Sequence, residues 1–358
     1  MKKLLYKIGL VLNYIFAVFL ILSYLSVTVS PQKVSFFALF GLFFPFFLII
    51  NLFFLVYRIY KKKAHLLISL IAILVGYNQI FTFLSINIKN HKIENTNTLK
   101  VMTYNVRMFD IYNWSKNKNT SNNIFSIIKN EDPDVICLQE FYSTRKHNWK
   151  KKIYNALKIK DFIVSSQNNK SFFGNAIFSK YQIVNQGFLK NGSPTQKCIY
   201  ADIKKGEDTI RVYVIHLASI HLDNDDYKFM KNIKLGIDNK NENIEGVKGI
   251  GGKLLKAYKN RAKEVDAIFP YIEKSPYRTI VCGDFNDTPI SYTYKKIRGN
   301  LKDSFIEKGF GIGNSYAGSL PLFRIDYILH SYQIKSLSYK RIAEKLSDHY
   351  PIIVDFKL

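Results

Sequence analysis

Three long apolar runs occupy the first quarter of the chain and constrain its folding more than any other feature. They extend over residues 4–29, 34–57 and 66–88. A helix needs about 20 apolar residues to cross the roughly 30 Å hydrocarbon core of a bilayer, so each run is long enough for one crossing. One such run alone is compatible with a buried core helix, but three in succession without amphipathic spacing favour membrane spans. We therefore expect residues 1–88 to form a membrane anchor with three transmembrane helices.

Basic residues flank these runs unevenly. Lys2, Lys3 and Lys7 lie at the N-terminus, and residues 58–63 contain four more, whereas the loop between the first two runs has only Lys33. Because basic residues concentrate on the cytoplasmic side of a membrane, the N-terminus is predicted to be cytoplasmic. The first run is also too long for a cleaved signal peptide. Three crossings then predict a multi-pass protein of a bacterial inner membrane, with everything after residue 88 in the periplasm.

The charge of the remaining residues indicates an anionic partner. The chain has a formal net charge of +25, and residues 99–358 hold 42 Lys or Arg and 26 Asp or Glu, which leaves +16 for this part alone. Phosphate groups, nucleic acid and an anionic lipid surface are the partners that such a charge favours. The alternative is that scattered lysines only solvate the surface. The three cysteines, Cys137, Cys198 and Cys282, lie in apolar stretches without disulfide or metal-ligand spacing, which predicts buried free thiols.

Short β-rich runs alternate with helical segments after a polar linker at residues 89–98. Several of the runs are almost continuously apolar, as strands covered on both faces are. This order predicts an α/β sandwich with helices outside stacked sheets, while residues 223–252 are expected to form an inserted loop or a mobile lid. The predicted strands are 99–106, 134–141, 174–179, 196–203, 210–217, 278–285, 324–330 and 350–356, and the predicted helices are 121–129, 144–157, 253–272 and 291–297, the last capped by Ser291.

Polar residues that can bind a hard cation, hold phosphate or move a proton lie at one end of six of these apolar runs. One polar strand end is ordinary, but six in one domain suggest that they meet at one mouth of the sandwich, where binding sites tend to lie. The residues are Asn105, Glu140, His216, Asp284 with Asn286, Asp326, and Asp348 with His349.

These residue types suit the hydrolysis of a phosphodiester. Carboxylate and amide oxygens bind Mg²⁺ or Mn²⁺, and there is neither a cysteine cluster nor an HExxH motif to indicate zinc. The reaction needs a Lewis acid on phosphate, a water with its base, and donors for the developing charge. Glu140 is a candidate metal ligand and Asp284 a candidate base, with His216 and His349 as donors to phosphate. Asp326 is expected to orient His349 and raise its pKa.

The motifs "GDFN", "RIDY" and "SDHYP", in this order, resemble those of the endonuclease/exonuclease/phosphatase superfamily of metal-dependent phosphoesterases. The resemblance covers about residues 99–358 and leaves the apolar N-terminal part outside. It implies a four-layered α/β/β/α sandwich. It also implies that Asn105, Glu140 and Asp348 lie near the metal, that Asp284 is the base, that Asn286 orients water or phosphate, that His216 contacts phosphate, and that Asp326 pairs with His349.

Some assignments have alternatives. His216 is preferred to His221 because it directly ends the strand-like "VYVI". Arg107, two residues after Asn105, is expected to contact either substrate phosphate or a neighbouring acid. Two segments, 223–252 and 309–322, are the predicted sites of substrate specificity, because specificity in such folds resides in loops.

The leading hypothesis is a membrane-anchored, Mg²⁺-dependent phosphoesterase, with Mn²⁺ as a second candidate ion. Its substrate would be nucleic acid, a phospholipid head group or a small phosphoester, and membrane lipid would surround its anchor. A catalytically inactive receptor or scaffold with the same sandwich is the alternative from another class. A glycosidase with paired carboxylates is a third, and would give both histidines no role.

Overall fold

The computed structural model describes residues 2–61, 65–87, 97–167, 171–189, 198–220, 223, 225–226, 228–229, 240–318 and 323–358. The chain divides into two compact units, each of which is described by itself. One unit contains residues 81–217, 264–289 and 296–358 and holds the two large β-sheets. The other contains residues 1–80, 218–263 and 290–295 and is mainly helical.

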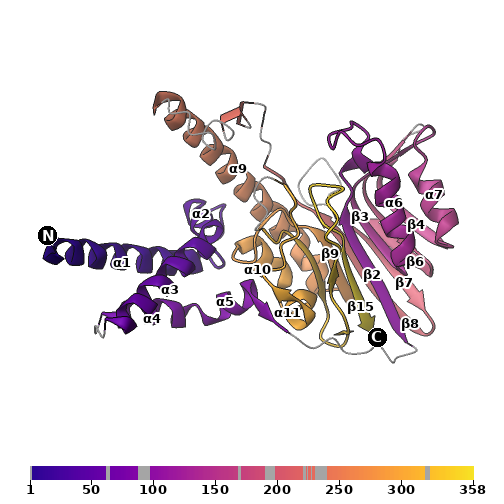
Figure 1. Cartoon of the computed structure of the whole chain (residues 1–358). Helices are drawn as coiled ribbons and strands as arrows, with labels where there is room; N and C mark the ends of the chain where they lie inside the picture. Colours follow the sequence, from indigo (N-terminus) through magenta and orange to yellow (C-terminus); the bar gives the residue numbers. More distant parts are fainter. Residues whose placement is uncertain are drawn as a thin grey trace. The chain divides into compact units, whose positions relative to one another are not determined.

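Two β-sheets form the centre of the first unit (Figure 1). In one, six strands follow the order β10-β12-β9-β8-β7-β6. In the other, a seven-stranded sheet has the order β13-β15-β2-β3-β5-β4, and β14 also pairs with β15. The strands of the six-stranded sheet are β6 (Gln182–Phe188), β7 (Cys198–Lys205), β8 (Asp208–His216), β9 (Arg278–Asp284), β10 (Lys302–Asp303) and β12 (Asp326–His330). Those of the seven-stranded sheet are β2 (Thr98–Asn105), β3 (Val135–Thr144), β4 (Asp161–Gln167), β5 (Ser171–Ser179), β13 (Lys335–Ser336), β14 (Lys340–Arg341) and β15 (Ile352–Lys357).

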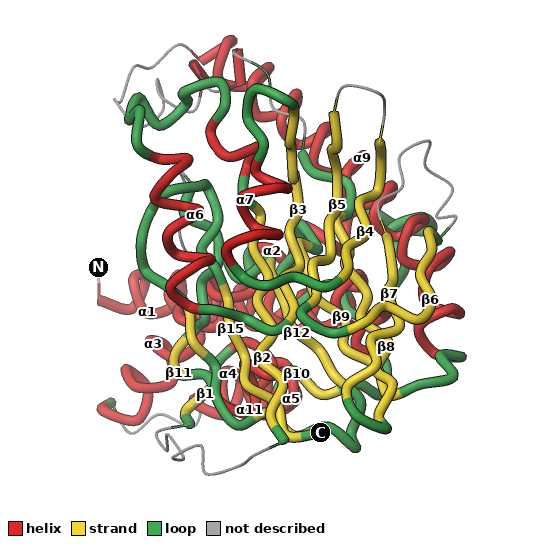
Figure 2. The backbone as a smooth tube through the Cα atoms, turned by 90° about the vertical axis from the view of Figure 1, so that its right-hand side faces the viewer, coloured by secondary structure: helices red, strands yellow, loops and turns green. Residues whose placement is uncertain are grey.

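Apolar side chains join the layers. One buried cluster lies between the sheets and includes Val101 of β2, Val212 of β8 and Ile280 of β9. A second cluster joins the outer face of the seven-stranded sheet to α6 (Thr120–Glu131) and α7 (Trp149–Ala156), which lie side by side in Figure 2. The end of α9 (Lys240–Glu273) contacts the other sheet, where the Tyr213 hydroxyl donates to the Tyr271 carbonyl over 2.9 Å. The predicted sandwich of stacked sheets with outer helices is confirmed.

One parallel pair of strands in each sheet brings polar residues to a common edge. β2 runs parallel to β3, with Asn105 beside Gln139, and β8 runs parallel to β9, with His216 beside Asp284. The carboxyl ends of parallel strands meet at the same edge of a sheet, which is where such folds bind ligands. These two pairs therefore position residues from four separate parts of the sequence.

A small two-stranded sheet joins the segment before the predicted linker to the same unit. Here β1 (Ser85–Ile86) pairs with β11 (Phe310–Gly311), and the Ser85 hydroxyl donates to the Gly309 carbonyl over 2.9 Å. Arg324, which is 2% exposed, binds Asp303 at 2.6 Å and donates to the Thr82 carbonyl at 2.5 Å. A buried arginine therefore holds residue 82 against the strand that carries Asp326.

All eight predicted strands are confirmed, and the differences from prediction fall at edges and insertions. The strands β4 and β6 were missed because edge strands carry polar residues that weaken the apolar pattern. The loop predicted for 223–252 is wrong over 240–252, where α9 is already helical. Ser291 does cap α10 (Tyr292–Arg298), because its hydroxyl accepts from the Tyr294 N–H at 3.1 Å. The three cysteines are buried and free, as expected.

The prediction of three uninterrupted membrane helices is not confirmed. Within the described residues, Lys3–Leu25 of α1 (Lys2–Leu25) is the one continuous helix long and apolar enough to cross a membrane. The second run is divided into α2 (Phe36–Leu42) and α3 (Phe44–Tyr60), bent by 60° at a break, with Pro45 in the first turn of α3. Proline is tolerated in a first turn and cannot continue a preceding helix, which accounts for the break there.

The third run is also divided. It forms α4 (Leu66–Val75) and α5 (Tyr77–Phe83), which are separated by Gly76, and its helical part ends at Phe83, before β1. A β-carbon at Gly76 would lie 2.1 Å from the ring of Tyr24, whose hydroxyl donates to the Ala72 carbonyl at 2.9 Å. The glycine therefore admits a helix contact that the apolar pattern alone does not reveal. Of the predicted linker 89–98, residues 89–96 lie outside the described residues, and Thr98 already belongs to β2.

Gly283 makes the close approach of β8 and β9 possible, and we predict that Gly283→Ala destabilises the protein strongly. Its φ is +135°, and a β-carbon there would lie 2.0 Å from the Ile215 carbonyl oxygen. We expect the free energy of unfolding to fall by at least about 3 kcal/mol. Guanidinium unfolding followed by tryptophan fluorescence measures this change.

Gly206→Ala is the matched control. Gly206 also has a positive φ, +61°, but a β-carbon there would have no other atom within 4 Å. Its replacement should cost only about 1 kcal/mol, the ordinary penalty for a left-handed residue. Equal losses in the two variants would contradict the steric explanation.

Candidate active site

The centre of the candidate site is Asp284, the last residue of β9. His216 of β8 lies beside it on one side, and Asp326 of β12 lies beside it on the other. The Asp284 side chain is 1% exposed. Three adjacent strands therefore place two carboxylates and an imidazole at one edge of the six-stranded sheet.

Amide groups hold the Asp284 carboxylate in place. Its Oδ1 accepts from the Asn286 backbone N–H at 2.8 Å. Its Oδ2 accepts from the side-chain Nδ2 atoms of Asn286 and Asn105, each at 3.2 Å. The Nδ2 of Asn286 also donates to the Leu217 carbonyl at 3.0 Å, which ties the motif "GDFN" to the end of β8. Asn286 has a φ of +53°, a conformation that asparagine adopts more readily than most residues.

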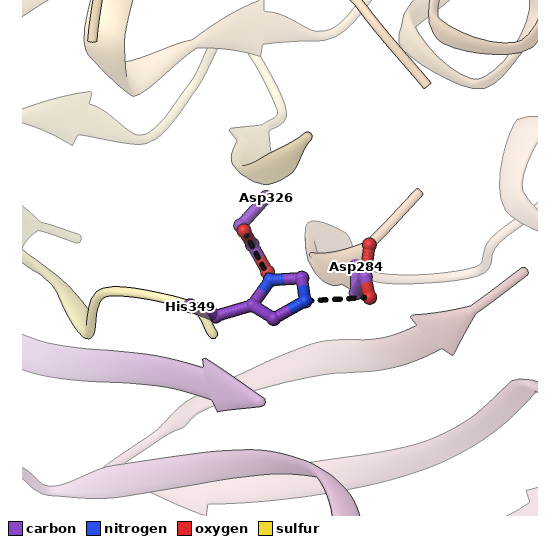
Figure 3. Close-up of side chains that lie close together, drawn as sticks. All are labelled: Asp284, Asp326 and His349. Carbon is purple, nitrogen blue, oxygen red and sulfur yellow. Dashed lines mark hydrogen bonds and ion pairs between the residues drawn. The ribbon is translucent and has the colours of Figure 1, made fainter. Parts of the chain in front are cut away.

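Two imidazoles face the same carboxylate oxygen. The Nε2 atoms of His349 and His216 lie 3.6 Å and 3.7 Å from Asp284 Oδ2. The other nitrogen of His349, Nδ1, lies 2.9 Å from Asp326 Oδ2, and Figure 3 shows the ring between the two carboxylates. The predicted pairing of Asp326 with His349 is present. It leaves Nε2 as the ring nitrogen that faces Asp284.

This arrangement shifts the acidity of both partners. Burial lowers the pKa of His349, but the negative charges of Asp326 and Asp284 outweigh burial and raise it to about 10. Burial raises the pKa of Asp284 to about 6, although His349 and His216 oppose this rise. At neutral pH the imidazole therefore holds a proton and the carboxylate has lost one.

Glu140 approaches from the seven-stranded sheet through a break in its strand pairing. The register between β3 and β5 shifts between Leu138 and Phe141, and Glu140 has a φ of +48° at this bulge. Its Oε1 accepts from Asn105 Nδ2 at 3.3 Å and lies 3.8 Å from His216 Nε2. Burial raises the pKa of Glu140 and Asp348 adds to the rise, while the hydrogen bond from Asn105 opposes it. The bulge thus turns an acid toward the residues of the other sheet.

Asp348 and Arg107 complete the predicted set. Ser347 donates its hydroxyl to the Asn105 carbonyl at 2.9 Å, which holds the "SDHYP" segment against the end of β2. The Arg107 Nε lies 3.5 Å from Asp348 Oδ2, and the Arg107 N–H donates to Asn105 Oδ1 at 3.1 Å. Of the two contacts predicted for Arg107, the one with a neighbouring acid is present.

The backbone at Arg107 is strained. Four consecutive residues of the short helix η1 (Arg107–Asp110) have φ values of +43°, +51°, +54° and +56°, and none is glycine. Each left-handed residue of this kind costs about 1–2 kcal/mol. Such strain concentrates at functional sites, because the surrounding structure must compensate for it.

The nine predicted site residues form one connected network of contacts. Asn105 links Glu140, Asp284 and Arg107, while Asp284 links the residues of β8, β12 and the "SDHYP" segment. Sequence reasoning missed Ser315 and Ser347. Ser315 accepts the Asp326 N–H at 2.9 Å, so it positions this carboxylate as Ser347 positions Asn105. A single serine in a loop carries no pattern that identifies such a role.

The donor atoms of the site fit a divalent cation. Ligand atoms of Asp284, Asp326 and His349 lie within 4.8 Å of one another. Glu140 adds a carboxylate beside them, since it and Asp284 both accept from Asn105 Nδ2. Among the described residues, the buried Oδ1 of Asp326 has no hydrogen-bond partner. The raised pKa values of Asp284 and Glu140 indicate that the protein compensates their negative charge incompletely. Oxygen-rich sites of this kind suit Mg²⁺ or Mn²⁺.

A family model described as the endonuclease/exonuclease/phosphatase family matches residues 102–349, which contain all nine site residues. The chain belongs to this family. Its members are hydrolases that act on phosphoester bonds. A second model, described as a domain of unknown function, matches residues 2–83. No curated protein is significantly similar in sequence.

Solved structures share the fold at low sequence identity. A humanized TDP2 from D. rerio is 15% identical with a TM-score of 0.50, and the match covers 74% of this chain and 100% of that one. The catalytic domain of human Nocturnin with a bound sulfate anion is 16% identical, again with a TM-score of 0.50, over 74% and 94% of the chains. An endonuclease/exonuclease/phosphatase from Beutenbergia cavernae is 15% identical with a TM-score of 0.50, over 73% and 72%. At these identities the likeness establishes the fold.

We predict that the imidazole of His349 remains protonated at pH 8 and that Asp326→Asn lowers its pKa. The variant keeps the side-chain shape but removes the nearest negative charge, so the charged imidazole loses stabilisation. We expect a fall of at least about one pH unit. Titration of the ¹⁵N-labelled histidine side chains by NMR measures it, with His349→Gln used for assignment. An unchanged titration in Asp326→Asn would contradict the electrostatic role of Asp326.

Proposed function

We propose that this protein hydrolyses phosphoester bonds by attack of a water molecule from which Asp284 removes a proton. The observation that carries the proposal is the position of the Asp284 carboxylate. It is buried, held by two asparagine amides, and faced by two imidazoles, within a chain of a phosphoesterase family. A protein that only binds a partner has no need of two buried carboxylates beside one histidine, because burying these charges costs stability.

The pKa values support the division of roles. A pKa of about 6 leaves Asp284 deprotonated at neutral pH yet basic enough to accept a proton from water. A pKa of about 10 keeps His349 charged, so its Nε2–H can donate to a phosphate oxygen that gains negative charge. Asp326 fixes the ring through Nδ1. In this proposal His216 is a second donor to phosphate, and Asn286 orients the base.

A divalent cation, Mg²⁺ or Mn²⁺, completes the proposed site. Glu140 and Asp348 would hold it through their carboxylate oxygens, and Asn105 through its Oδ1, which accepts from the Arg107 N–H in this structure. When bound, the ion would act as a Lewis acid on a phosphate oxygen. In the structure Asn105 Nδ2 donates to Glu140 and Asp284, so the amide links the residues of the proposed ion site to the base.

We also propose that residues 2–83 anchor the catalytic part to a membrane. In this region the pattern of a water-soluble protein is reversed, since polar groups are buried between helices while apolar ones are exposed. Asn13 donates to Ser69 at 2.6 Å and Asn51 to the Phe16 carbonyl at 2.9 Å, and both asparagines are 0% exposed. Exposed apolar residues include Leu4, Val11, Ile49, Phe53 and Val56, each more than half exposed. Such a face suits a lipid environment.

Asp284→Asn should lower turnover at least about 10²-fold, the lower range for loss of a general base. The assay is hydrolysis of bis(p-nitrophenyl) phosphate by the full chain in detergent with Mg²⁺, repeated with Mn²⁺ and with a chelator. Asp208→Asn is the matched control, because Asp208 lies on the same strand as His216 at its opposite end and pairs with Arg278.

Three outcomes are informative. Loss in Asp284→Asn alone, with rescue of the chelated protein by added ion, supports the proposal. Equal turnover in the two variants would remove Asp284 from the role of base. Absence of ion-dependent turnover on phosphodiesters and phosphomonoesters, with the fold intact, would favour an inactive binding protein.

Lys2, Lys3 and Lys7 lie in the first turns of α1 and support a cytoplasmic N-terminus, so an odd number of crossings, which we propose, places the catalytic part outside the cytoplasm. A periplasmic reporter enzyme, alkaline phosphatase, fused after Leu358 should therefore be active in bacterial cells, while a cytoplasmic reporter at the same position should not. The reverse result would place the catalytic part in the cytoplasm. Recovery of the fusion in the soluble fraction after carbonate extraction would argue against an anchor.

A further inference from the structure

The segment that follows β2 carries two exposed aromatic side chains beside the site. Tyr112 and Trp114 are 68% and 41% exposed, and their ring centroids lie 5.1 Å apart with a tilt of 55°. Large aromatic residues bury 150–250 Å² in ordinary cores, so exposure of two in contact indicates a binding surface.

Specific contacts hold this segment in shape. Asp110 is 9% exposed, its carbonyl accepts from the Asn113 N–H at 2.8 Å, and its carboxylate accepts from the Ser115 N–H at 3.2 Å. The Ser115 hydroxyl lies 2.7 Å from that of Thr120, the first residue of α6. The loop that carries the aromatic pair is therefore held by hydrogen bonds to Asp110 before it and to Thr120 after it.

Arg107 connects the aromatic pair to the acids of the site. Its guanidinium carbon lies 4.5 Å from the centroid of the Trp114 ring, while its Nε lies 3.5 Å from Asp348. One arginine side chain thus spans from an aromatic face to the candidate ion site. If the phosphate of a ligand is bound at the candidate ion site, the group attached to that phosphate would lie beside Trp114.

The chemistry of this surface selects among phosphoesters. A nucleic acid strand alternates phosphates with flat rings, and bases stack well on tryptophan, tyrosine and arginine planes. A choline head group also binds aromatic rings, but its positive charge would meet Arg107 and a part of the chain with net charge +16 over residues 99–358. Sugar-like head groups can pack C–H faces on the exposed rings, but they lack the flat π-system of a base that also stacks on the guanidinium plane of Arg107.

We propose that Tyr112 and Trp114 stack a base of a nucleic acid strand whose neighbouring phosphate lies at Asp284. This rests on the proposed function and names its substrate class as single-stranded nucleic acid. The segments first predicted to set specificity, 223–252 and 309–322, are not needed for it. Of their aromatic residues, Tyr316 packs edge-on against the His349 ring at 5.6 Å, and Tyr227 lies outside the described residues.

The test compares two oligonucleotides on the full chain in detergent. One is an ordinary single strand, and the other has the same backbone with abasic residues beside the cleaved bond. Trp114→Ala should lower kcat/KM for the ordinary strand about 10-fold more than for the abasic strand, as expected for loss of one stacked base. Trp114→Phe should recover part of the loss. Tyr332→Ala, which removes an aromatic residue 71% exposed at another place, should change neither value.

A binding measurement separates this inference from the proposed function. Fluorescence anisotropy of a labelled single strand, with Asp284→Asn to prevent cleavage, should show weaker binding after Trp114→Ala. If no phosphoester is hydrolysed but this loss of binding is seen, the aromatic surface stands and the catalytic proposal fails. If bis(p-nitrophenyl) phosphate is hydrolysed while the ordinary and abasic strands respond alike to Trp114→Ala, the aromatic surface is overturned. Loss of binding to phosphatidylglycerol vesicles, with oligonucleotide binding unchanged, would also overturn it.

Discussion

The other groups of the site are arranged around two buried carboxylates that face one imidazole. Asp284 and Asp326 are 1% and 2% exposed, and His349 lies between them. Like charges in such a place are tolerated only if neighbouring groups compensate them. The amides of Asn105 and Asn286 and the imidazole of His216 compensate part of this negative charge. A divalent cation would compensate the rest. The same imbalance that costs stability gives Asp284 and His349 the acidities that acid–base chemistry needs.

The arrangement depends on matched ends of two sheets. Each sheet has one parallel pair, β2 with β3 and β8 with β9, and the ends of both pairs meet around Asp284. Besides Arg107, three positions there have backbone conformations that most side chains avoid: Glu140 at a bulge, Gly283 at a close approach and Asn286 after it. Because β3 and β9 are largely buried and each lies between two neighbouring strands, the fold can sustain these local costs.

The sequence predicts features that depend on a local apolar pattern better than features that depend on contacts between distant residues. Strands buried on both faces have a continuous apolar pattern, so all eight were found, and the polar residues at their ends identified the site. The breaks at Phe43 and Gly76 escaped because a hydropathy pattern records length and composition, while a break depends on Pro45 and on contact with Tyr24. Trp114 escaped for a related reason. Its position beside Arg107 follows from a left-handed turn that no periodicity encodes.

The contacts of residues 82–87 show that the polar segment after them is not the sole connection to the catalytic sheets. Arg324, itself paired with Asp303, donates to the Thr82 carbonyl, and β1 pairs with β11, so the chain before this segment is already attached to the catalytic sheets by hydrogen bonds. A protease cut between residues 88 and 96 would break the covalent connection without breaking this one. The two fragments would remain associated, in the manner of a split protein, and a catalytic fragment begun at residue 99 would leave Arg324 buried without its carbonyl partner.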